Sequence, residues 1–423
     1  MKNSILFLGA LLLTQVLFAQ DKLHSVLILN EGRFDYINGT QAVPVSLGKY
    51  DPANKSYTKI TEIANVRFAS DLKIHGDYIL IAADSLLIKL DRYSYQELGR
   101  VKIEGIRKLA ISNDKVFVSR GEYLKNFKSY LNVYSLQDLS LETEIDTSMG
   151  PKYATEGLAV VDDKLYVAIN NAFDFGNEIG ALGTYDINQS SYSGELTLPD
   201  AAANPDNLMI KGNKLYTLNN HSYDTSSITE IDLSLNQSNT SYLQNVSAGC
   251  GTSALYEGVV LYQELAEQTM YSFDTDQRNV TDSVNLSMNF YGLAVSPFDG
   301  DLYTTTTDFA NTGALLVYRN WNLIDSLEIS VSAGNIAFDI RNTSSVENID
   351  LTNIQLYPNP SKDLVFISGI VSDKLSVEVI SLEGRSILKS EDSRLDLSSI
   401  PRGIYLVSIQ TEEGSTVRKL NLL

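Results

Sequence analysis

The sequence of 423 residues predicts an all-β protein, a seven-bladed β-propeller followed by a small antiparallel β-sandwich. The first observation is a recurring phrase of apolar strand, polar turn and second apolar strand, seen clearly in Gly157–Asn171. The second is the spacing of its copies, which follow each other in steps of 37 to 50 residues. The copies are anchored at Leu72, Leu109, Leu158, Leu208, Ala254, Leu293 and Ile336.

A period of about forty residues with four short strands per unit is typical of a propeller. Between two anchors a third and a fourth strand are expected, for example at Ala181–Ile187 and Tyr192–Leu198. An irregular β-sandwich can also place strands at short spacing. The recurrence of one hairpin phrase in register favours the propeller.

The two ends of the repeat array complement each other. Ile336–Ile340 reads as an innermost strand with nothing after it, whereas Ser25–Ile60 contains outer strands with no innermost strand before them. We therefore expect the last strand to complete the first blade. A ring closed in this way has no free sheet edge.

The chain begins with a predicted secretory signal peptide at residues 1–19. Lys2 precedes an apolar run, Ile5–Phe18, and the small residue Ala19 follows it. This run is short for a bilayer span, although a membrane anchor is the alternative. No cysteine follows the run, so a lipoprotein signal is excluded, and the propeller is expected at residues 20–341 of an exported protein.

Composition fits an exported protein. The net charge is -19, from 33 Lys and Arg against 52 Asp and Glu, which favours solubility and argues against nucleic acid or anionic membrane as a partner. The lone Cys250 cannot form an internal disulfide. Stability must then come from the closed ring and its apolar layers.

Long, turn-rich segments are predicted on one face of the ring, between the second and third strands of several blades. Asn30–Ser46 is one such segment, and Ser119–Tyr130 and Ile169–Ala181 are others. Their aromatic residues, expected to converge on one rim, are Phe34, Tyr36, Tyr123, Phe127, Phe173, Phe175, Tyr223 and Phe309. Such loops suit a large, partly apolar, uncharged ligand. The alternative is that these rings only cap the blade tops.

The candidate ligand-binding residues combine aromatic rings, which would stack on an apolar ligand surface, with side chains that would meet its amides. They are Asn30, Phe34, Tyr36, Phe127, Asn171, Phe173, Asn220, His221 and Tyr223. A highly anionic ligand would need a local positive patch from Arg33, Lys125 or Lys128.

Catalytic signals are poor, so the sequence predicts a protein that is not an enzyme and holds no metal or cofactor. Of the three histidines, only His221 falls on the loop-rich face. No nucleophile elbow, zinc-protease motif or phosphate loop occurs. The acidic turns Asp274–Asp276 and Asp299–Asp301 lack the later glutamate of a calcium loop and read as hairpin turns.

The character of the chain changes after Arg341. Residues 342–349 form a short polar linker, and residues 350–423 contain alternating apolar runs separated by turns. These runs predict the small antiparallel sandwich.

This final segment closely resembles the type A C-terminal sorting domain of the type IX secretion system of Bacteroidota. The matching positions are Tyr357, Pro358, Asn359, Pro360, Gly384, Gly403, Tyr405, Arg418 and Lys419. The resemblance implies the type IX secretion machinery as partner, passage through the outer membrane, and removal of the domain. The mature protein would then be released or attached to the cell surface.

The first blade carries a second resemblance, to the YncE-like surface propellers of Bacteroidota that include cobalamin-capturing partners of outer-membrane corrinoid transporters. Asn30–Gly32 and Tyr50–Pro52 carry this likeness. It implies a non-enzymatic protein that binds a corrinoid and partners an outer-membrane receptor.

Three classes of function are left open. A ligand-capture propeller explains the export route, the acidic body and the aromatic loops. A protein-interaction or adhesion propeller explains all but the convergence of those loops. A secreted lyase or lactonase is the third class, although the expected histidine and acidic clusters are missing.

Overall fold

The computed structural model describes residues 21–221, 225–248, 252–266, 268–342, 354–369, 375–382, 384–411 and 414–423. The chain forms two compact units, one spanning Leu23–Asp339 and the other including Ile340–Leu423. No helix in these ranges has the length and apolar character that a membrane crossing needs. The predicted signal peptide, linker residues 343–349, Tyr223 and Cys250 lie outside the described residues.

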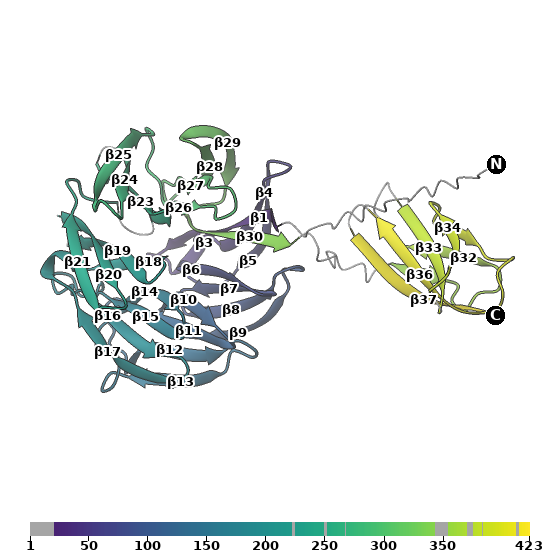
Figure 1. Ribbon diagram of the computed structural model, residues 1–423, viewed down its shortest axis with the longest axis horizontal. Helices are drawn as coiled ribbons and strands as arrows, with labels where there is room; N and C mark the ends of the chain where they lie inside the picture. The colour runs from purple at the N-terminus through teal and green to yellow at the C-terminus, as the bar shows by residue number, and fades with distance from the viewer. Residues whose placement is uncertain are drawn as a thin grey trace, which may run out of the picture. The chain divides into compact units, whose positions relative to one another are not determined.

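The predicted propeller is confirmed, because the described part of residues 21–342 forms seven four-stranded antiparallel sheets. Figure 1 shows the sheets fanning out from a centre, with the first strand of each sheet innermost. The first three sheets are β30 (Ala333–Asn342), β1 (Asp21–Asn30), β4 (Val45–Asp51) and β5 (Ser56–Ile63); β6 (Asp71–His75), β7 (Tyr78–Ala83), β8 (Leu86–Asp91) and β9 (Glu97–Lys102); and β10 (Ile106–Ser112), β11 (Lys115–Arg120), β12 (Ser129–Ser135) and β13 (Leu141–Asp146).

The remaining four sheets follow in chain order, and one short 3₁₀ helix, Asp200–Ala202, precedes the second of them. Their strands are β14 (Thr155–Val161), β15 (Lys164–Ile169), β16 (Ala181–Asp186) and β17 (Ser191–Thr197); β18 (Pro205–Lys211), β19 (Lys214–His221), β20 (Thr225–Asp232) and β21 (Gln237–Tyr242); β22 (Ser253–Tyr256), β23 (Val259–Gln263), β24 (Thr269–Asp274) and β25 (Asn279–Asn285); and β26 (Gly292–Val295), β27 (Leu302–Thr305), β28 (Gly313–Arg319) and β29 (Asn322–Ile329).

The recurring polar turn joins the two innermost strands of a sheet by two residues. Its first residue has a positive φ in four consecutive sheets, at Gly76, Asn113, Asp162 and Gly212. Glycine, asparagine and aspartate adopt this left-handed conformation at the least cost. The turn chemistry that the sequence repeats is therefore what sets the hairpin register.

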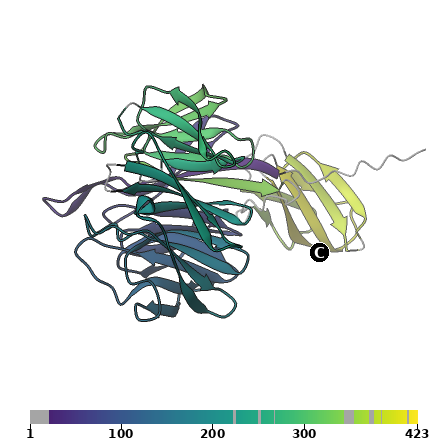
Figure 2. The same cartoon turned by 60° about the vertical axis from the view of Figure 1, so that its left-hand side comes forward.

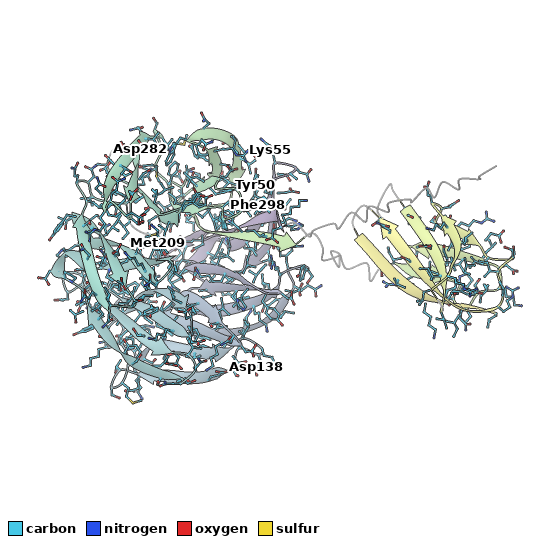
Figure 3. All side chains as sticks on the ribbon, viewed as in Figure 1. Tyr50, Lys55, Asp138, Met209, Asp282 and Phe298 are labelled. Atoms are coloured by element: carbon cyan, nitrogen blue, oxygen red, sulfur yellow. The ribbon has the colours of Figure 1, made fainter. Side chains whose placement is uncertain are left out.

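The core lies between neighbouring sheets rather than in one central mass. Leu27 and Leu47 of one sheet, for example, pack with Ile79 and Ile81 of the next. Figure 3 shows side chains filling the spaces between sheets, and the labelled Met209 is buried in one of these layers. Each layer removes apolar surface from water at about 25 cal/mol per Å², so the ring is stabilised sheet by sheet.

The closing strand β30 pairs with β1, as the sequence indicated. Figures 1 and 2 both show the green β30 beside the purple β1. Phe338 packs edge-on against Tyr303 with ring centroids 5.3 Å apart, and buried Asp339 forms an ion pair with Arg92 at 2.5 Å. Side-chain contacts therefore hold the closing strand to both neighbouring sheets. β30 continues through Asn342, one residue past the predicted end of the propeller.

A separate two-stranded hairpin, β2 (Arg33–Asp35) and β3 (Thr40–Val43), leaves the ring after β1. Arg33 donates a hydrogen bond to the carbonyl oxygen of Ala310 at 3.3 Å, and Gln41 donates one to the carbonyl oxygen of Ile63 at 3.1 Å. These bonds fix the base of the hairpin on the ring.

The predicted small sandwich is also confirmed. One sheet contains β31 (Gln355–Tyr357), β32 (Leu364–Ser368) and β35 (Arg394–Asp396), and the other contains β34 (Ser386–Ser390), β33 (Leu375–Ser381), β36 (Gly403–Thr411) and β37 (Gly414–Leu422). Leu356 and Val365 from the first sheet share a core with Val377, Val407 and Leu420 from the second.

Candidate functional site

The innermost strands of three neighbouring sheets share a local irregularity. Their pairing register shifts between Ile106 and Leu109, between Thr155 and Leu158, and between Pro205 and Leu208. A β-bulge redirects side chains and is common beside binding sites. The first residues within these three bulges are Arg107, Glu156 and Asp206. The same irregularity thus occurs at three charged residues, and all three line one cavity.

That cavity has a volume of about 370 Å³ and lies on the loop-rich face of the propeller unit. Most of its wall comes from residues at or just before the start of innermost strands and from the β15–β16 loop, and Glu31 after β1 and Asn220 on β19 complete it. The wall includes Glu31, Phe68, Ser70, Arg107, Lys108, Glu156, Asn170, Ala172, Phe173, Phe175, Asn204, Asp206, Asn220, Tyr291, Gly334 and Asn335. A second space of about 180 Å³ shares Lys108, Asp206, Gly334 and Asn335 with it and continues between the innermost strands. The cavity is within the usual size range of ligand sites, about 300–1,000 Å³.

Arg107 is a charged residue of the cavity wall. Its Nε and Nη2 each donate to a carboxylate oxygen of Glu156 at 2.9 Å, and its guanidinium lies 5.1 Å from the centroid of the Phe173 ring. Burial lowers the pKa of Arg107, but the charge and hydrogen bonds of Glu156 outweigh burial and raise it, so the guanidinium stays charged.

The innermost strands β14 and β18 approach each other closely at the cavity. A side chain at Gly157 would place its Cβ 2.2 Å from the carbonyl oxygen of Asp206. Only glycine leaves room for β14 and β18 to lie this near each other.

Glu31 is another charged residue of the cavity wall. Tyr291 donates its hydroxyl hydrogen to Oε1 of Glu31 at 2.7 Å, and the backbone N–H of Glu31 donates to the carbonyl oxygen of Ser332 at 2.8 Å. Burial raises the pKa of Glu31 to about 7, against the opposing effects of the Tyr291 hydrogen bond and of Lys108 and Arg107. Both protonation states are therefore populated near neutral pH.

Three asparagines differ in what they offer to a ligand. Asn204 donates to the carbonyl oxygen of Asn220 at 3.0 Å, and Asn220 donates to that of Ser247 at 3.2 Å, so both amides are engaged in the fold. Asn170 is only 2% exposed and its Oδ1 accepts from the N–H of Ala172 at 3.2 Å. Within the described residues, its Nδ2 has no hydrogen-bond partner. This amide is a donor held at the cavity wall.

Of the residues that the sequence singled out, Phe173 and Asn220 lie in the cavity wall, together with Phe175. Asn171 is next to the wall and closes its own loop by donating to the carbonyl oxygen of Asn177 at 2.9 Å. His221 is exposed at the end of β19.

Asn30 occupies a different environment from the one expected. It is 0% exposed, and its amide donates to the carbonyl oxygen of Ser46 at 3.1 Å and to the hydroxyl of Tyr57 at 2.9 Å. The expectation that Asn30 meets a ligand does not fit this burial, because its amide serves to tie β1 to β4 and β5.

The aromatic residues are divided among separate contacts. Phe34 packs edge-on against exposed Tyr36 on the β2–β3 hairpin, at 5.0 Å between ring centroids. Phe127 packs against Tyr130 and lies under the Arg120 guanidinium at 4.1 Å. Phe127 therefore caps its sheet, as the alternative interpretation held for such rings. Among the described residues, Phe173 and Phe175 are the predicted aromatics that belong to the cavity wall.

Sequence reasoning missed the charged wall of the cavity. The signal was present, because six residues placed two positions before an anchor line the cavity. They are Ser70, Arg107, Glu156, Asp206, Tyr291 and Gly334.

In the described part of the chain, no group of three or more His, Cys, Asp or Glu side chains is placed to hold a metal ion.

In the sorting segment, Asn359 links the first motif to the last strand. Its Nδ2 donates to the carbonyl oxygen of Lys419 at 2.7 Å, and its Oδ1 accepts from the N–H of Asn421 at 3.0 Å. Arg418 donates from Nε to the carbonyl oxygen of Ile354 at 2.9 Å, and Tyr405 donates to that of Pro401 at 2.6 Å. Exposed Tyr357 stacks on Phe366, and Gly384 takes a positive φ of 83° in a turn.

Comparison with known proteins defines what this segment is. Residues 355–422 match the family described as the secretion system C-terminal sorting domain. The protein is thus exported by the type IX secretion machinery to the cell surface or the extracellular space. A curated relative, beta-agarase D of Zobellia galactanivorans, is 31% identical over 116 residues, which are 24% of this chain and 23% of the agarase. The chain spans about a quarter of the length of that relative.

Solved structures show the fold of the larger unit. A hypothetical selenium-binding protein from Sulfolobus tokodaii aligns with a TM-score of 0.53 at 10% identity, over 75% of this chain and 91% of that one. A proposed 6-phosphogluconolactonase from Bacteroides fragilis aligns with a TM-score of 0.54 at 11% identity, over 75% and 98%. At such low identity the likeness concerns the fold alone. The protein is a β-propeller exported with a sorting domain.

Proposed function

We propose that this protein is a secreted or surface-attached propeller that captures a ligand in the cavity lined by Arg107, Glu156 and Phe173, without transforming it. The observation that carries the proposal is the repeated bulge at the entrances of β10, β14 and β18, which directs Arg107, Glu156 and Asp206 into one cavity. Bulges of this kind interrupt ladder hydrogen bonds, so three in the same place are better explained by a site than by stability.

A corrinoid handed to an outer-membrane receptor is the most specific form of the proposal. The cavity is small compared with a corrinoid, so such a ligand would place only an amide-bearing edge in it, beside Asn170. The apolar surface of the ligand would then lie across Phe173 and Phe175. Exposed Tyr123, 5.9 Å from Phe175 between ring centroids, extends this aromatic surface.

Calorimetry with cobalamin and the purified protein tests this form. A Phe173→Ala variant should bind at least tenfold more weakly, because the lost ring accounts for about 1.5–3 kcal/mol of apolar burial. Phe127→Ala is the matched control, since that ring packs on Tyr130 outside the cavity wall. No heat with the parent protein removes the corrinoid, and equal affinity in all three proteins removes the cavity as its site.

A secreted lactonase or lyase is the second candidate, because one observation favours it. Glu31 titrates near neutral pH within hydrogen-bond distance of Tyr291, which suits general acid–base catalysis. Turnover of a lactone panel that disappears in Glu31→Gln would support this candidate. A parent protein that binds a compound and returns it unchanged supports capture.

A further inference from the structure

The cavity wall contains more acidic side chains than basic ones. Three carboxylates, of Glu31, Glu156 and Asp206, face two cations, Arg107 and Lys108. Glu156 holds Arg107 with two hydrogen bonds, and Lys108 donates to the carbonyl oxygen of Ser70 at 2.8 Å. The wall therefore has more negative than positive charge, and both of its cations already have acceptors.

Glu31 is the carboxylate with spare capacity. Its Oε1 accepts from Tyr291, whereas no described residue donates to its Oε2. Gly334 leaves space beside it, since a Cβ there would lie 2.6 Å from Oε1. An ionised carboxylate in such a place gains from an incoming cation more than an exposed one does, because little water competes.

Asn170 supplies the second, independent feature. This side chain is almost wholly buried and belongs to the cavity wall, and its Nδ2 has no partner among the described residues. Such a polar group is normally satisfied by protein, water or a ligand. A ligand with a hydrogen-bond acceptor would satisfy this one.

We propose that the cavity selects an amine-bearing polar ligand, whose ammonium group lies against Oε2 of Glu31 beside the Tyr291 ring while a hydroxyl or carbonyl oxygen accepts from Asn170. This inference rests on the proposed capture function and names the chemical class of the ligand. The ammonium donates to Oε2 of Glu31, and the aromatic ring adds a cation–π attraction. Phe309 holds that ring from the side, with centroids 5.1 Å apart.

Binding of an ammonium group is then linked to loss of a proton from Glu31. With a pKa of about 7, Glu31 is about three quarters protonated at pH 6.5. An ammonium prefers the ionised form, so binding at this pH releases about 0.7 proton. The charged groups facing the cavity are Arg107 and Lys108 of β10, Glu156 of β14 and Asp206 of β18.

Matched pairs of probes test the proposal on the full chain. Cadaverine is compared with 1,5-pentanediol, and glucosamine with glucose, by calorimetry at pH 6.5 in two buffers of different ionisation enthalpy. We expect each amine to bind at least tenfold more tightly than its hydroxyl partner and to release about 0.7 proton. Glu31→Gln should abolish both the preference and the proton release, whereas Glu62→Gln, an exposed residue of β5, should change neither.

The outcomes separate this inference from the capture function. Equal binding of amine and hydroxyl probes, binding without proton release, or no binding of any amine overturns the amine preference. Cobalamin binding that Phe173→Ala weakens and Glu31→Gln leaves unchanged keeps the capture function and also overturns the amine preference.

Discussion

Replacing Asp339 by alanine should destabilise the propeller strongly, because this residue fastens the closing strand. Asp339 is 0% exposed on β30, and Arg92, 14% exposed after β8, donates to its Oδ1 at 2.7 Å from Nε. Removing one partner of a buried ion pair costs about 3–5 kcal/mol, since the other charge loses its partner. Arg92 retains some contact with water, so we expect about 3 kcal/mol, a large part of the total stability of a typical domain.

Urea unfolding followed by tryptophan fluorescence measures this loss. The chain has one tryptophan, Trp321, which lies between β28 and β29, so the signal reports on the propeller. Adding Arg92→Ala to Asp339→Ala should cost less than Arg92→Ala alone, because the ion pair is already broken and only contacts such as the Nη1 bond to the carbonyl oxygen of Gly76 remain to be lost. The exposed pair Lys59–Glu62 gives the control, where Glu62→Ala should cost about 0.5 kcal/mol or less. A loss below 1 kcal/mol in Asp339→Ala would refute the role assigned to this ion pair.

Three further predictions concern other parts of the chain. Glu31, with a pKa raised from 4.5 to about 7, binds more protons folded than unfolded, so its contribution to stability falls as pH rises through that window. Glu31→Gln should remove up to about 3 kcal/mol of this pH dependence in urea unfolding, and an unchanged slope contradicts the assigned pKa. Intact-mass measurement of surface protein should find a start near Gln20 and no Tyr357–Leu423, and a retained segment would count against processing. Asn359→Ala should loosen β37, destabilise the sorting domain by about 1–3 kcal/mol and speed its proteolysis, and wild-type resistance would show that the link to Lys419 is dispensable.

The fold was predictable because its determinants are local and repeated. Each of the anchors Leu72, Leu109, Leu158, Leu208, Ala254, Leu293 and Ile336 lies on the innermost strand of a four-stranded sheet. A two-residue turn with a residue suited to positive φ follows the innermost strand in the clearest copies. The hydrophobic pattern of the strands and the residues of the turns favour the same fold, and such agreement is what makes a sequence specify one structure.

The site was less predictable because its residues are far apart in the sequence and meet only when the sheets close into a ring. A bulge shifts strand register by one residue beside Arg107, Glu156 and Asp206, whereas simple alternation places each of them on the same face of its strand as the apolar anchor two residues later. Asn30 shows a different limit, since a polar residue at the end of β1 was predicted to meet a ligand and is wholly buried in the fold. Its amide nitrogen donates to the backbone of β4.

The central claim, capture of a ligand in the propeller cavity, is tested most directly by filling that cavity. Ala172 belongs to its wall, and Ala172→Trp would occupy much of the space. The parent protein and this variant are each incubated with an extract of small metabolites, washed, and analysed by native mass spectrometry before and after denaturation. We predict that the parent protein releases a bound compound, unchanged in mass from the free one, and that the equally stable variant releases none. Identical compounds from both proteins, or none from the parent, would contradict the account.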